Sequence, residues 1–306
     1  MFKLSFILIS SLLISNTNAS TKKNALDKAH ASFSESITKF SDDIDSFFAN
    51  KKHVGVVNKS KLTISLDSYF REDRGPYAVP DIDYRLILPR TEKSLRLIFQ
   101  SDNDDNDRET RKTTEGRQGS QQTEQNSTTA ALRYMVEKSG IEFSADTGVI
   151  VNIPIVIFSK FRAKKSIKFK KWVFKINEQL KWVNSRGITS DLDLDFDRRL
   201  SKTFLFRMVN NTFWNDQDYI VRFENGPSLF QKIDEKRALS YHAYIVSVNK
   251  PSLVVDNYLL QLTYRQIIYS NWVFMNVTPF LHFPRAENFH RTPGLIIGLD
   301  AVFGKL

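Results

Sequence analysis

The sequence predicts an all-β fold, a closed antiparallel transmembrane β-barrel of about fourteen strands, with twelve to sixteen allowed by the pattern. Three observations support this prediction. Apolar and polar residues alternate with a period of two through most of residues 59–306. Aromatic residues gather at the ends of the alternating segments, and the connections between segments differ in length in the way that bacterial barrels require.

Residues 187–197 show the alternation most clearly. Four carboxylates stand two residues apart, and apolar residues stand between them: Asp191, Asp193, Asp195 and Asp197 alternate with Leu192, Leu194 and Phe196. Successive side chains of a strand point to opposite faces, so one face here is a row of carboxylates and the other is apolar. A helix would scatter the same residues around its axis. The segment therefore predicts a strand that separates water from an apolar environment.

Thirteen further segments show the same period and are predicted to be strands. They cover residues 61–67, 81–88, 95–100, 128–137, 141–149, 155–164, 172–182, 204–214, 219–231, 239–248, 256–269, 272–283 and 294–303. We expect a longer loop around Gly75 and Pro76, and a tight turn at residues 89–93. Short connections at 137–141, 165–171, 198–203, 234–238 and 270–271 are separated by wider ones such as 250–255 and 284–293, which predicts short periplasmic turns and longer outer loops.

Residues 101–127 contain almost no apolar side chain, and we expect a long solvated loop. The acidic run at residues 102–107 invites comparison with a calcium-binding loop. Such a loop needs glycine at its sixth position and glutamate at its twelfth, where this chain has Asp107 and Thr113. We therefore predict no metal site.

The first nineteen residues have the form of a secretory signal peptide. Lys3 gives a positive start, residues 4–14 are apolar, and small residues end at Ala19. An uncleaved anchor is the alternative, but polar residues follow at once. No other stretch has eighteen continuous apolar residues, so a membrane location requires a barrel.

Residues 20–58 are predicted to be a periplasmic amphipathic helix and a linker. Within residues 24–50, apolar side chains recur every three or four positions, at Leu26, Ala29, Phe33, Ile37, Phe40, Ile44, Phe47 and Phe48. We expect this helix to pack on the periplasmic mouth of the barrel. Insertion into the lumen as a plug is the alternative, whereas about three heptads are too few to indicate a coiled coil.

Composition narrows the function classes. The chain has no cysteine, which excludes disulfides, thiolate metal sites and cysteine nucleophiles. The formal net charge is +10, and it remains +9 after removal of the segment that contains Lys3. An excess of this size often indicates nucleic acid. Because the chain is predicted to be exported, phosphates of lipopolysaccharide or an anion-attracting lumen explain the charge better, and no nucleic acid partner is expected.

A soluble barrel that binds a ligand or partner is the structural alternative, because it also alternates apolar and polar residues. Aromatic residues at strand ends favour the membrane, where they form belts at the two interfaces. The predicted belt residues are Trp172, Trp182, Trp214, Tyr219, Tyr258, Tyr269, Trp272 and Phe283. Charged residues also recur on one face of nearly every segment, which suits a water-filled wall.

Residues 298–303, which contain Gly298 and Phe303, resemble the closing segment of porin-like outer-membrane barrels of Gram-negative bacteria. The resemblance implies that insertion machinery recognises this segment. The chain departs from that pattern because Gly304, Lys305 and Leu306 follow the aromatic residue. Residues 47–48, 86–89, 198–201 and 229–241 also resemble a group of uncharacterised exported proteins of Gram-negative bacteria, which implies no activity.

The aspartate strand is predicted to line a lumen beside basic neighbours. Lys175 and Lys181 fall on the preceding strand and Arg207 on the following one. Opposite charges across a strand pair stabilise the pair by roughly 0.2–1 kcal/mol each. One hypothesis is a structural ladder, and the other is a charged constriction that selects solutes by sign and size.

An enzyme and a binding module are the remaining alternatives. Ser240 and His242 lie two residues apart and share a face, so a hydroxyl and an imidazole can meet as in outer-membrane lipid hydrolases. Their order differs from the phospholipase pattern, no residue fixed by spacing orients the imidazole, and the face is the lumen side, where Tyr244 also lies. The basic residues Lys160, Arg162, Lys164, Lys165, Lys168, Lys170 and Lys171 can contact a partner or anionic lipid, or form a solvated turn.

The function predicted from sequence is therefore passive: a porin-like channel or a structural barrel with a charged lumen in the outer membrane of a Gram-negative bacterium. No cofactor is expected, and no enzyme activity. The predicted partners are outer-membrane lipid, lipopolysaccharide and the barrel-insertion machinery.

Overall fold

A computed structural model contains fourteen antiparallel strands that form one closed barrel, in which each strand pairs with its neighbours in sequence and the last pairs with the first. It describes residues 40, 44, 47, 48, 60–72, 74–87, 95–101, 128–151, 153–217 and 219–304. The strands are β1 (Lys61–Arg71), β2 (Arg74–Ile87), β3 (Leu95–Ser101), β4 (Thr128–Lys138), β5 (Ile141–Val151), β6 (Val156–Phe169), β7 (Trp172–Val183), β8 (Gly187–Arg199), β9 (Phe204–Asn215), β10 (Val221–Lys232), β11 (Arg237–Val248), β12 (Val254–Tyr269), β13 (Val273–Pro284) and β14 (Thr292–Gly304), with the short helix η1 (Arg285–Glu287) before β14. The predicted fold class and strand number are confirmed.

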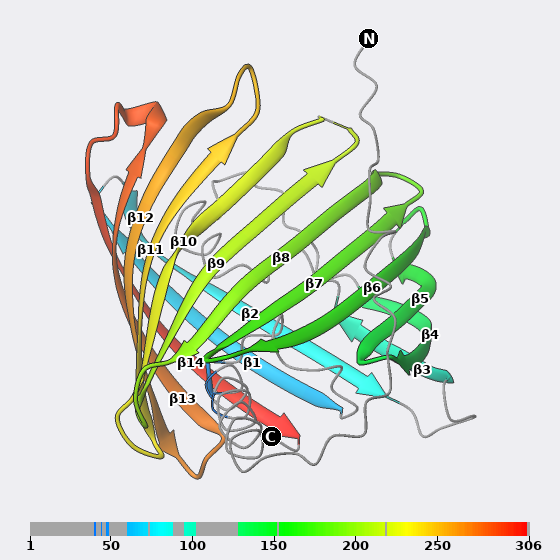
Figure 1. Ribbon diagram of the computed structural model, residues 1–306, viewed down its shortest axis with the longest axis horizontal. Coiled ribbons are helices and arrows are strands. Elements are labelled where there is room, and N and C mark those ends of the chain that lie inside the picture. Colours follow the sequence, from blue (N-terminus) through cyan, green and yellow to red (C-terminus); the bar gives the residue numbers. More distant parts are fainter. Residues whose placement is uncertain are drawn as a thin grey trace.

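The two ends of the barrel differ. In Figure 1, β7 to β9 cross the front of the barrel, and β1 and β2 cross behind them. At one end, here called the short-turn end, β1 begins, β14 ends, and connections as short as residues 139–140 and 170–171 join the strands. The opposite end, here called the long-loop end, carries the connections at 249–253 and 285–291. At this end β3 stops at residue 101 and β4 starts at residue 128. Short turns on one side and longer loops on the other are typical of outer-membrane barrels.

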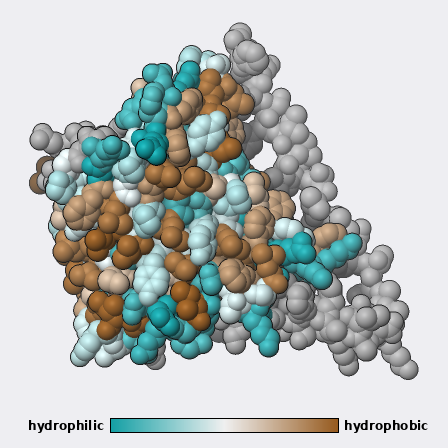
Figure 2. All heavy atoms as spheres, turned by 90° about the vertical axis from the view of Figure 1, so that its left-hand side faces the viewer, coloured by the Kyte–Doolittle hydropathy of each residue, from teal (hydrophilic) through white to brown (hydrophobic). Residues whose placement is uncertain are grey.

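The outer surface of the strands is apolar and the inner wall is polar. Large apolar side chains that are exposed on the outer surface include Ile64, Leu97, Tyr134, Phe161, Trp182, Leu260 and Leu299. Figure 2 shows one side of this surface, where apolar and weakly polar residues cover much of the middle and hydrophilic residues gather toward the top and bottom. Ionisable side chains on the opposite face, such as Arg133 and Asp195, are buried inside the barrel. A soluble barrel has the reverse arrangement, so this orientation is that of a membrane-embedded barrel.

Two predicted connections are wrong. Gly75 and Pro76 belong to β2, and only residues 72–73 lie between β1 and β2. The register moves by one residue there, so that Gly75 and Pro76 together oppose Phe70 in a β-bulge. A bulge tolerates the missing N–H of proline, which explains why a turn signal occurs inside a strand. The connection expected at 165–171 is also shorter, because β6 continues to Phe169 and places Lys165 and Lys168 in the sheet.

Most of the segments before β1 and between β3 and β4 lie outside the described residues. These include the predicted signal peptide, most of the predicted helix at 24–50, and the acidic run at 102–107. Phe40, Ile44 and Phe47 have helical backbone, and the N–H of Phe48 donates a hydrogen bond to the carbonyl oxygen of Ile44 over 3.0 Å. The part of the chain that the structure describes has no helix long and apolar enough to cross a membrane.

Candidate channel lumen

The aspartate row of β8 lies on the inner wall between β7 and β9. Asp197 is fully buried and stands opposite Arg207 on β9. Arg207 donates from Nε to Oδ1 over 2.6 Å and from Nη2 to Oδ2 over 2.8 Å. The ammonium of Lys175 on β7 lies 3.4 Å from the same Oδ2. A carboxylate held in this way by a bidentate guanidinium and an ammonium joins three strands.

Asp193 and Asp191, which lie nearer the long-loop end, are held by side-chain amides. Asn211 on β9 donates from Nδ2 to Asp191 Oδ1 over 2.6 Å and to Asp193 Oδ1 over 2.5 Å. Asn177 on β7 donates to Asp193 Oδ2 over 3.0 Å. Asp195 stands opposite Lys175 in the register and is also buried. The four carboxylates therefore form a continuous acidic row along the wall.

A mainly basic row crosses the neighbouring strands along their register, from near the short-turn end of β3 to near the long-loop end of β7. The residues that face each other from β3 to β7 are Arg96, Arg133, Asp146, Lys160 and Lys181, and all five are buried. Arg133 and Asp146 form a bidentate pair with two contacts of 2.6 Å. Four bases against one acid give this part of the wall a positive formal charge. Lys181 thus lies in this row, where its partner on β8 is Thr189 rather than an aspartate.

A second acid–base cluster lies on the far side, at β12 to β14. Arg265 donates from Nη1 to Asn276 Oδ1 over 2.7 Å and to Asp300 Oδ2 over 2.5 Å. Asn276 donates to the same carboxylate oxygen over 2.9 Å. The space beside Gly298 on β14 is filled by the side chains of Asp67 and Asn276, so a larger residue would collide with them. This packing is a structural reason for glycine in the closing segment.

His242 lies on the inner wall of β11, but its hydroxyl partners differ from the predicted one. Its Nδ1 is 2.8 Å from Ser228 Oγ and 2.9 Å from the hydroxyl oxygen of Tyr244, and these two oxygens are 3.0 Å apart. Ser240 is fully buried, and its Oγ makes no hydrogen bond within the described part of the chain. The predicted meeting of Ser240 with His242 is therefore wrong. The register places Ser228 directly opposite His242, whereas Ser240 faces Phe230.

An aromatic cluster fills the inner wall near the long-loop end of β11 to β2. Its buried members are Tyr69, Tyr244, Leu259, Phe280 and Ile296, and Tyr77, Val79 and Val209 pack against them. The rings of Tyr69 and Tyr77 are stacked with centroids 4.8 Å apart. Phe280 lies over Gly294, where no side chain would fit. This side of the wall is therefore lined by packed aromatic and aliphatic side chains.

The described residues before β1 contact the inner wall at the short-turn end. Phe40 and Ile44 are buried against Leu205 on β9 and Phe230 on β10, and Phe48 packs against the same cluster. The ring centroids of Phe47 and Phe274 are 6.1 Å apart in an edge-on arrangement.

Cations lie next to these rings. Arg207 lies over the ring of Phe230 at 5.3 Å, and Arg265 lies over the ring of Phe274 at 4.2 Å. Arg199 at the end of β8 lies over the ring of Phe40 at 4.6 Å. These rings, here called the aromatic layer, are Phe40, Phe47, Phe48, Phe230 and Phe274. The layer packs directly on two acid–base clusters, Arg207–Asp197 and Arg265–Asp300, so its position depends on theirs.

The predicted belt residues lie at both ends of the outer surface. Trp172, Tyr269 and Trp272 are at the short-turn end, and Trp182, Trp214, Tyr219, Tyr258 and Phe283 are toward the long-loop end. Trp272 contacts Tyr269 and Phe303 with centroid distances of 5.7 and 5.1 Å. Aromatic side chains at two levels fit two membrane interfaces. Recognition of Gly298 and Phe303 by insertion machinery stays a prediction.

Among the described residues, no group of three or more His, Asp or Glu side chains is placed to hold a metal ion. The lumen carboxylates are instead bound to guanidinium, ammonium and amide groups. The arrangement supplies fixed charges of both signs, and hydrogen bonds hold Asp197, Arg207, Arg133, Asp146 and Asp193 in place.

Comparisons with known proteins give structural similarity only. No protein-family model matches the sequence, and no curated protein matches it. Solved structures that are similar are outer-membrane barrels. They include a loop-deletion mutant of OmpT of Vibrio cholerae (10% identity, 80% of this chain and 98% of that chain, TM-score 0.47), a porin (7%, 80% and 100%, 0.46) and the KdgM porin in complex with disordered oligogalacturonate (7%, 79% and 99%, 0.37).

Proposed function

We propose that the protein is a passive outer-membrane channel whose charged lumen favours anions and is narrowed at its short-turn end by the aromatic residues between Phe40 and Phe48. The short-turn end faces the periplasm in this proposal, because bacterial barrels carry their short turns there. The single observation that supports conduction is the polarity of the barrel wall, which is ionic on its inner face and apolar on its outer face. Buried ionic rows on β3 to β9 face inward while the outer surface is apolar.

The basic row supports the preference for anions. Arg96, Arg133, Lys160 and Lys181 follow one line of the strand register along the wall, with Asp146 as the acid among them. Fixed charges in a pore select permeating ions by sign, whether or not each charge has a neighbour of opposite sign, because the solute responds to their sum. Replacement of Lys160 and Lys181 by glutamine is expected to move the reversal potential in a salt gradient toward cation preference.

The aromatic layer supports narrowing. Phe40 and Ile44 occupy space inside the wall at Leu205 and Phe230, and Phe47 does so at Phe274. The predicted amphipathic helix would carry these residues on its apolar face, as its spacing requires. In this proposal the helix enters the short-turn end of the lumen, instead of packing on the rim.

The test is step conductance of the purified full chain in planar bilayers, compared with the Phe230→Ala variant and with a chain lacking residues 20–58. Both variants are expected to give larger steps, because each removes part of the aromatic layer. Phe206→Ala is the matched control, since Phe206 lies on the outer surface of the neighbouring strand beside Trp172. No step in any of these proteins, with folding verified by heat-modifiable migration on a gel, would refute the channel.

A further inference from the structure

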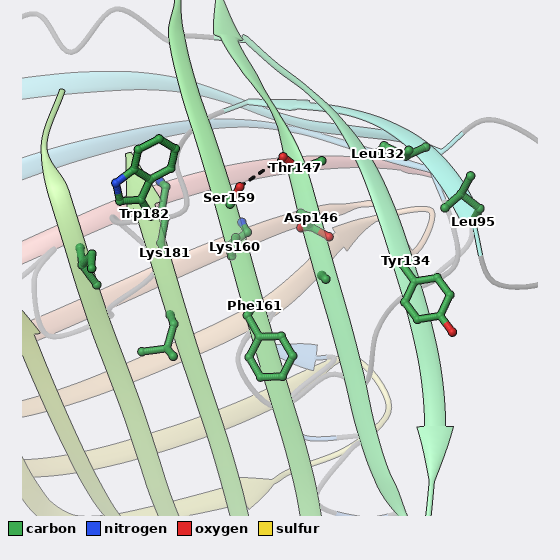
Figure 3. A pocket seen from close by; sticks show the side chains of 13 residues that line it. Leu95, Leu132, Tyr134, Asp146, Thr147, Ser159, Lys160, Phe161, Lys181 and Trp182 are labelled. Carbon is green, nitrogen blue, oxygen red and sulfur yellow. Dashed lines mark hydrogen bonds between the residues drawn. The ribbon is translucent and has the colours of Figure 1, made fainter. Parts of the chain in front are cut away.

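The outer surface of β3 to β8 carries a hollow of about 520 Å³, which runs from Leu95 on β3 to Trp182 and Ile188 near the long-loop ends of β7 and β8. Its floor is made of small residues, Ala145, Thr147 and Ser159, which lie on β5 and β6. Figure 3 shows Thr147 and Ser159 between Leu132 and Tyr134 on one side and Trp182 on the other. The hollow therefore lies in the surface that faces hydrocarbon.

Strand register explains why the surface is hollow here. Ala145 stands between Tyr134 and Phe161, and Ser159 stands beside Trp182, so small residues are flanked by large rings. The polar atoms of the floor are bonded within it. The Oγ atoms of Thr147 and Ser159 are 3.2 Å apart, and Thr147 also donates to the carbonyl oxygen of Phe158 over 3.5 Å. The floor can therefore contact a hydrocarbon chain without leaving these polar atoms unbonded.

A cation lies in the turn that joins β7 and β8, two strands whose residues Trp182 and Ile188 line the hollow. Trp182 is followed by the turn 184–186 at the long-loop end, where Arg186 is exposed. An apolar hollow with an arginine at its surface end matches a lipid that has an anionic headgroup. The long-loop end faces the outer leaflet in a barrel with this turn asymmetry.

We propose that this hollow binds one acyl chain of the lipid A part of lipopolysaccharide, with a phosphate of its headgroup near Arg186. The site requires only the membrane-facing orientation of the strands, and it is independent of conduction through the lumen. Ala145, Thr147 and Ser159 form its floor, and Trp182 forms one wall.

Trp182 provides the probe, because the chain has four tryptophans. A protein that retains only Trp182 is compared with one that retains only Trp214, which lies near the same end on the outer surface of β9. Both are reconstituted in phosphatidylcholine vesicles with a low fraction of brominated phosphatidylcholine, whose acyl chains quench indole fluorescence. In the absence of lipid A, brominated chains enter the hollow, and we expect stronger quenching of Trp182 than of Trp214 because a binding site holds the quencher there.

Added unlabelled lipid A is expected to relieve the excess quenching of Trp182 and to leave Trp214 unchanged. Ala145→Leu, which fills the floor, is expected to abolish both the excess and its relief, whereas Ala301→Leu on the outer surface of β14 is the matched control and preserves them. Arg186→Gln is expected to require roughly fivefold more lipid A for half relief, from about 1 kcal/mol per surface cation.

Equal quenching of Trp182 and Trp214 by the brominated lipid would contradict the proposal that the hollow binds an acyl chain. Relief by unbrominated phosphatidylcholine as effective as relief by lipid A would overturn the assignment to lipid A. Heat-modifiable migration of Ala145→Leu equal to that of Ala301→Leu verifies that the filled variant is folded.

Discussion

The two sides of the lumen wall differ in chemistry although they share one barrel and one kind of outer surface. From β3 to β9 the wall carries rows of ionised side chains, with Asp197, Arg207 and Arg133 buried in bidentate pairs. From β11 to β2, the wall near the long-loop end carries packed aromatic and aliphatic side chains, and the ionic pair of Arg265 and Asp300 lies nearer the short-turn end. Lipid imposes the same apolar requirement on every outward position. The inward positions have no common requirement, so the function of the barrel depends on how they divide between charge and rings.

The largest expected effect is on the charged side. Asp197→Asn removes the carboxylate that holds both Arg207 and Lys175 and leaves two cations close together in a buried place. Loss of one partner from a buried pair costs about 3–5 kcal/mol. The free energy of unfolding is measured by urea titration in vesicles, with Asp234→Asn in an exposed turn as control. Equal midpoints for the two variants would show that the charged side does not stabilise the barrel.

The aromatic side is expected to respond to steric change. Gly226→Ala on β10 would place Cβ against the carbonyl oxygen of Ala243 and the Cα of Tyr244, which are backbone atoms and cannot move aside cheaply. We expect a loss of about 1–3 kcal/mol. Gly75→Ala is the control, because its Cβ would meet nothing within 4 Å. A smaller effect at Gly226 than at Gly75 in the same titration would contradict the close packing.

Tyr244 tests the junction between the two sides, since its ring belongs to the aromatic cluster and its hydroxyl to the His242 cluster. Tyr244→Phe keeps the ring and removes the hydroxyl that meets Ser228 and His242. A loss of about 1 kcal/mol is expected, whereas Ser240→Ala, which removes a hydroxyl that makes no hydrogen bond to any described residue, is expected to be neutral or slightly stabilising. The reverse order of the two variants would assign the important hydroxyl to Ser240.

The smallest expected effect lies outside both sides, in the turn after β10. The side-chain hydrogen bond from Arg237, followed by the backbone N–H of Lys236, lowers the pKa of Asp234 below its ordinary value. A lowered pKa in the folded state stabilises the protein above the unfolded value of roughly 3.9, and this stabilisation disappears as pH falls through the folded value.

The measurement for Asp234 is the difference in urea midpoint between the wild-type chain and Asp234→Asn. It is expected to be small and favourable to the wild-type chain at pH 7, and to shrink as the pH falls below the unfolded value of roughly 3.9. The carboxylate is exposed, so high salt is expected to reduce the difference. A difference that grows on acidification would contradict the sign of the shift.

Sequence alternation predicted the strands and their faces because a period of two depends only on neighbours along the chain. The same argument placed Lys175 and Arg207 on strands next to the aspartate row. It did not predict that Arg133 meets Asp146 or that Arg265 meets Asp300, because such pairs depend on the register between strands.

Register also explains two of the three local errors. Ser240 and His242 share a face, but the hydroxyl that reaches the imidazole comes from Ser228 across the strand pair. The Gly75–Pro76 signal correctly marked an irregular backbone. Only the pairing with β1 could show that the irregularity is a bulge within a strand.

The pairing of β14 with β1 along eleven consecutive positions has a consequence for biogenesis. Each of these two strands leaves a row of amide and carbonyl groups without partners when the other is missing, and hydrocarbon offers none. A polypeptide cut before residue 292 would therefore present two unpaired strand edges, those of β1 and β13, to the bilayer. The chain therefore has to be synthesised through its final strand before the barrel can insert into lipid. Truncated chains are expected to be degraded by periplasmic proteases and not to form narrower pores.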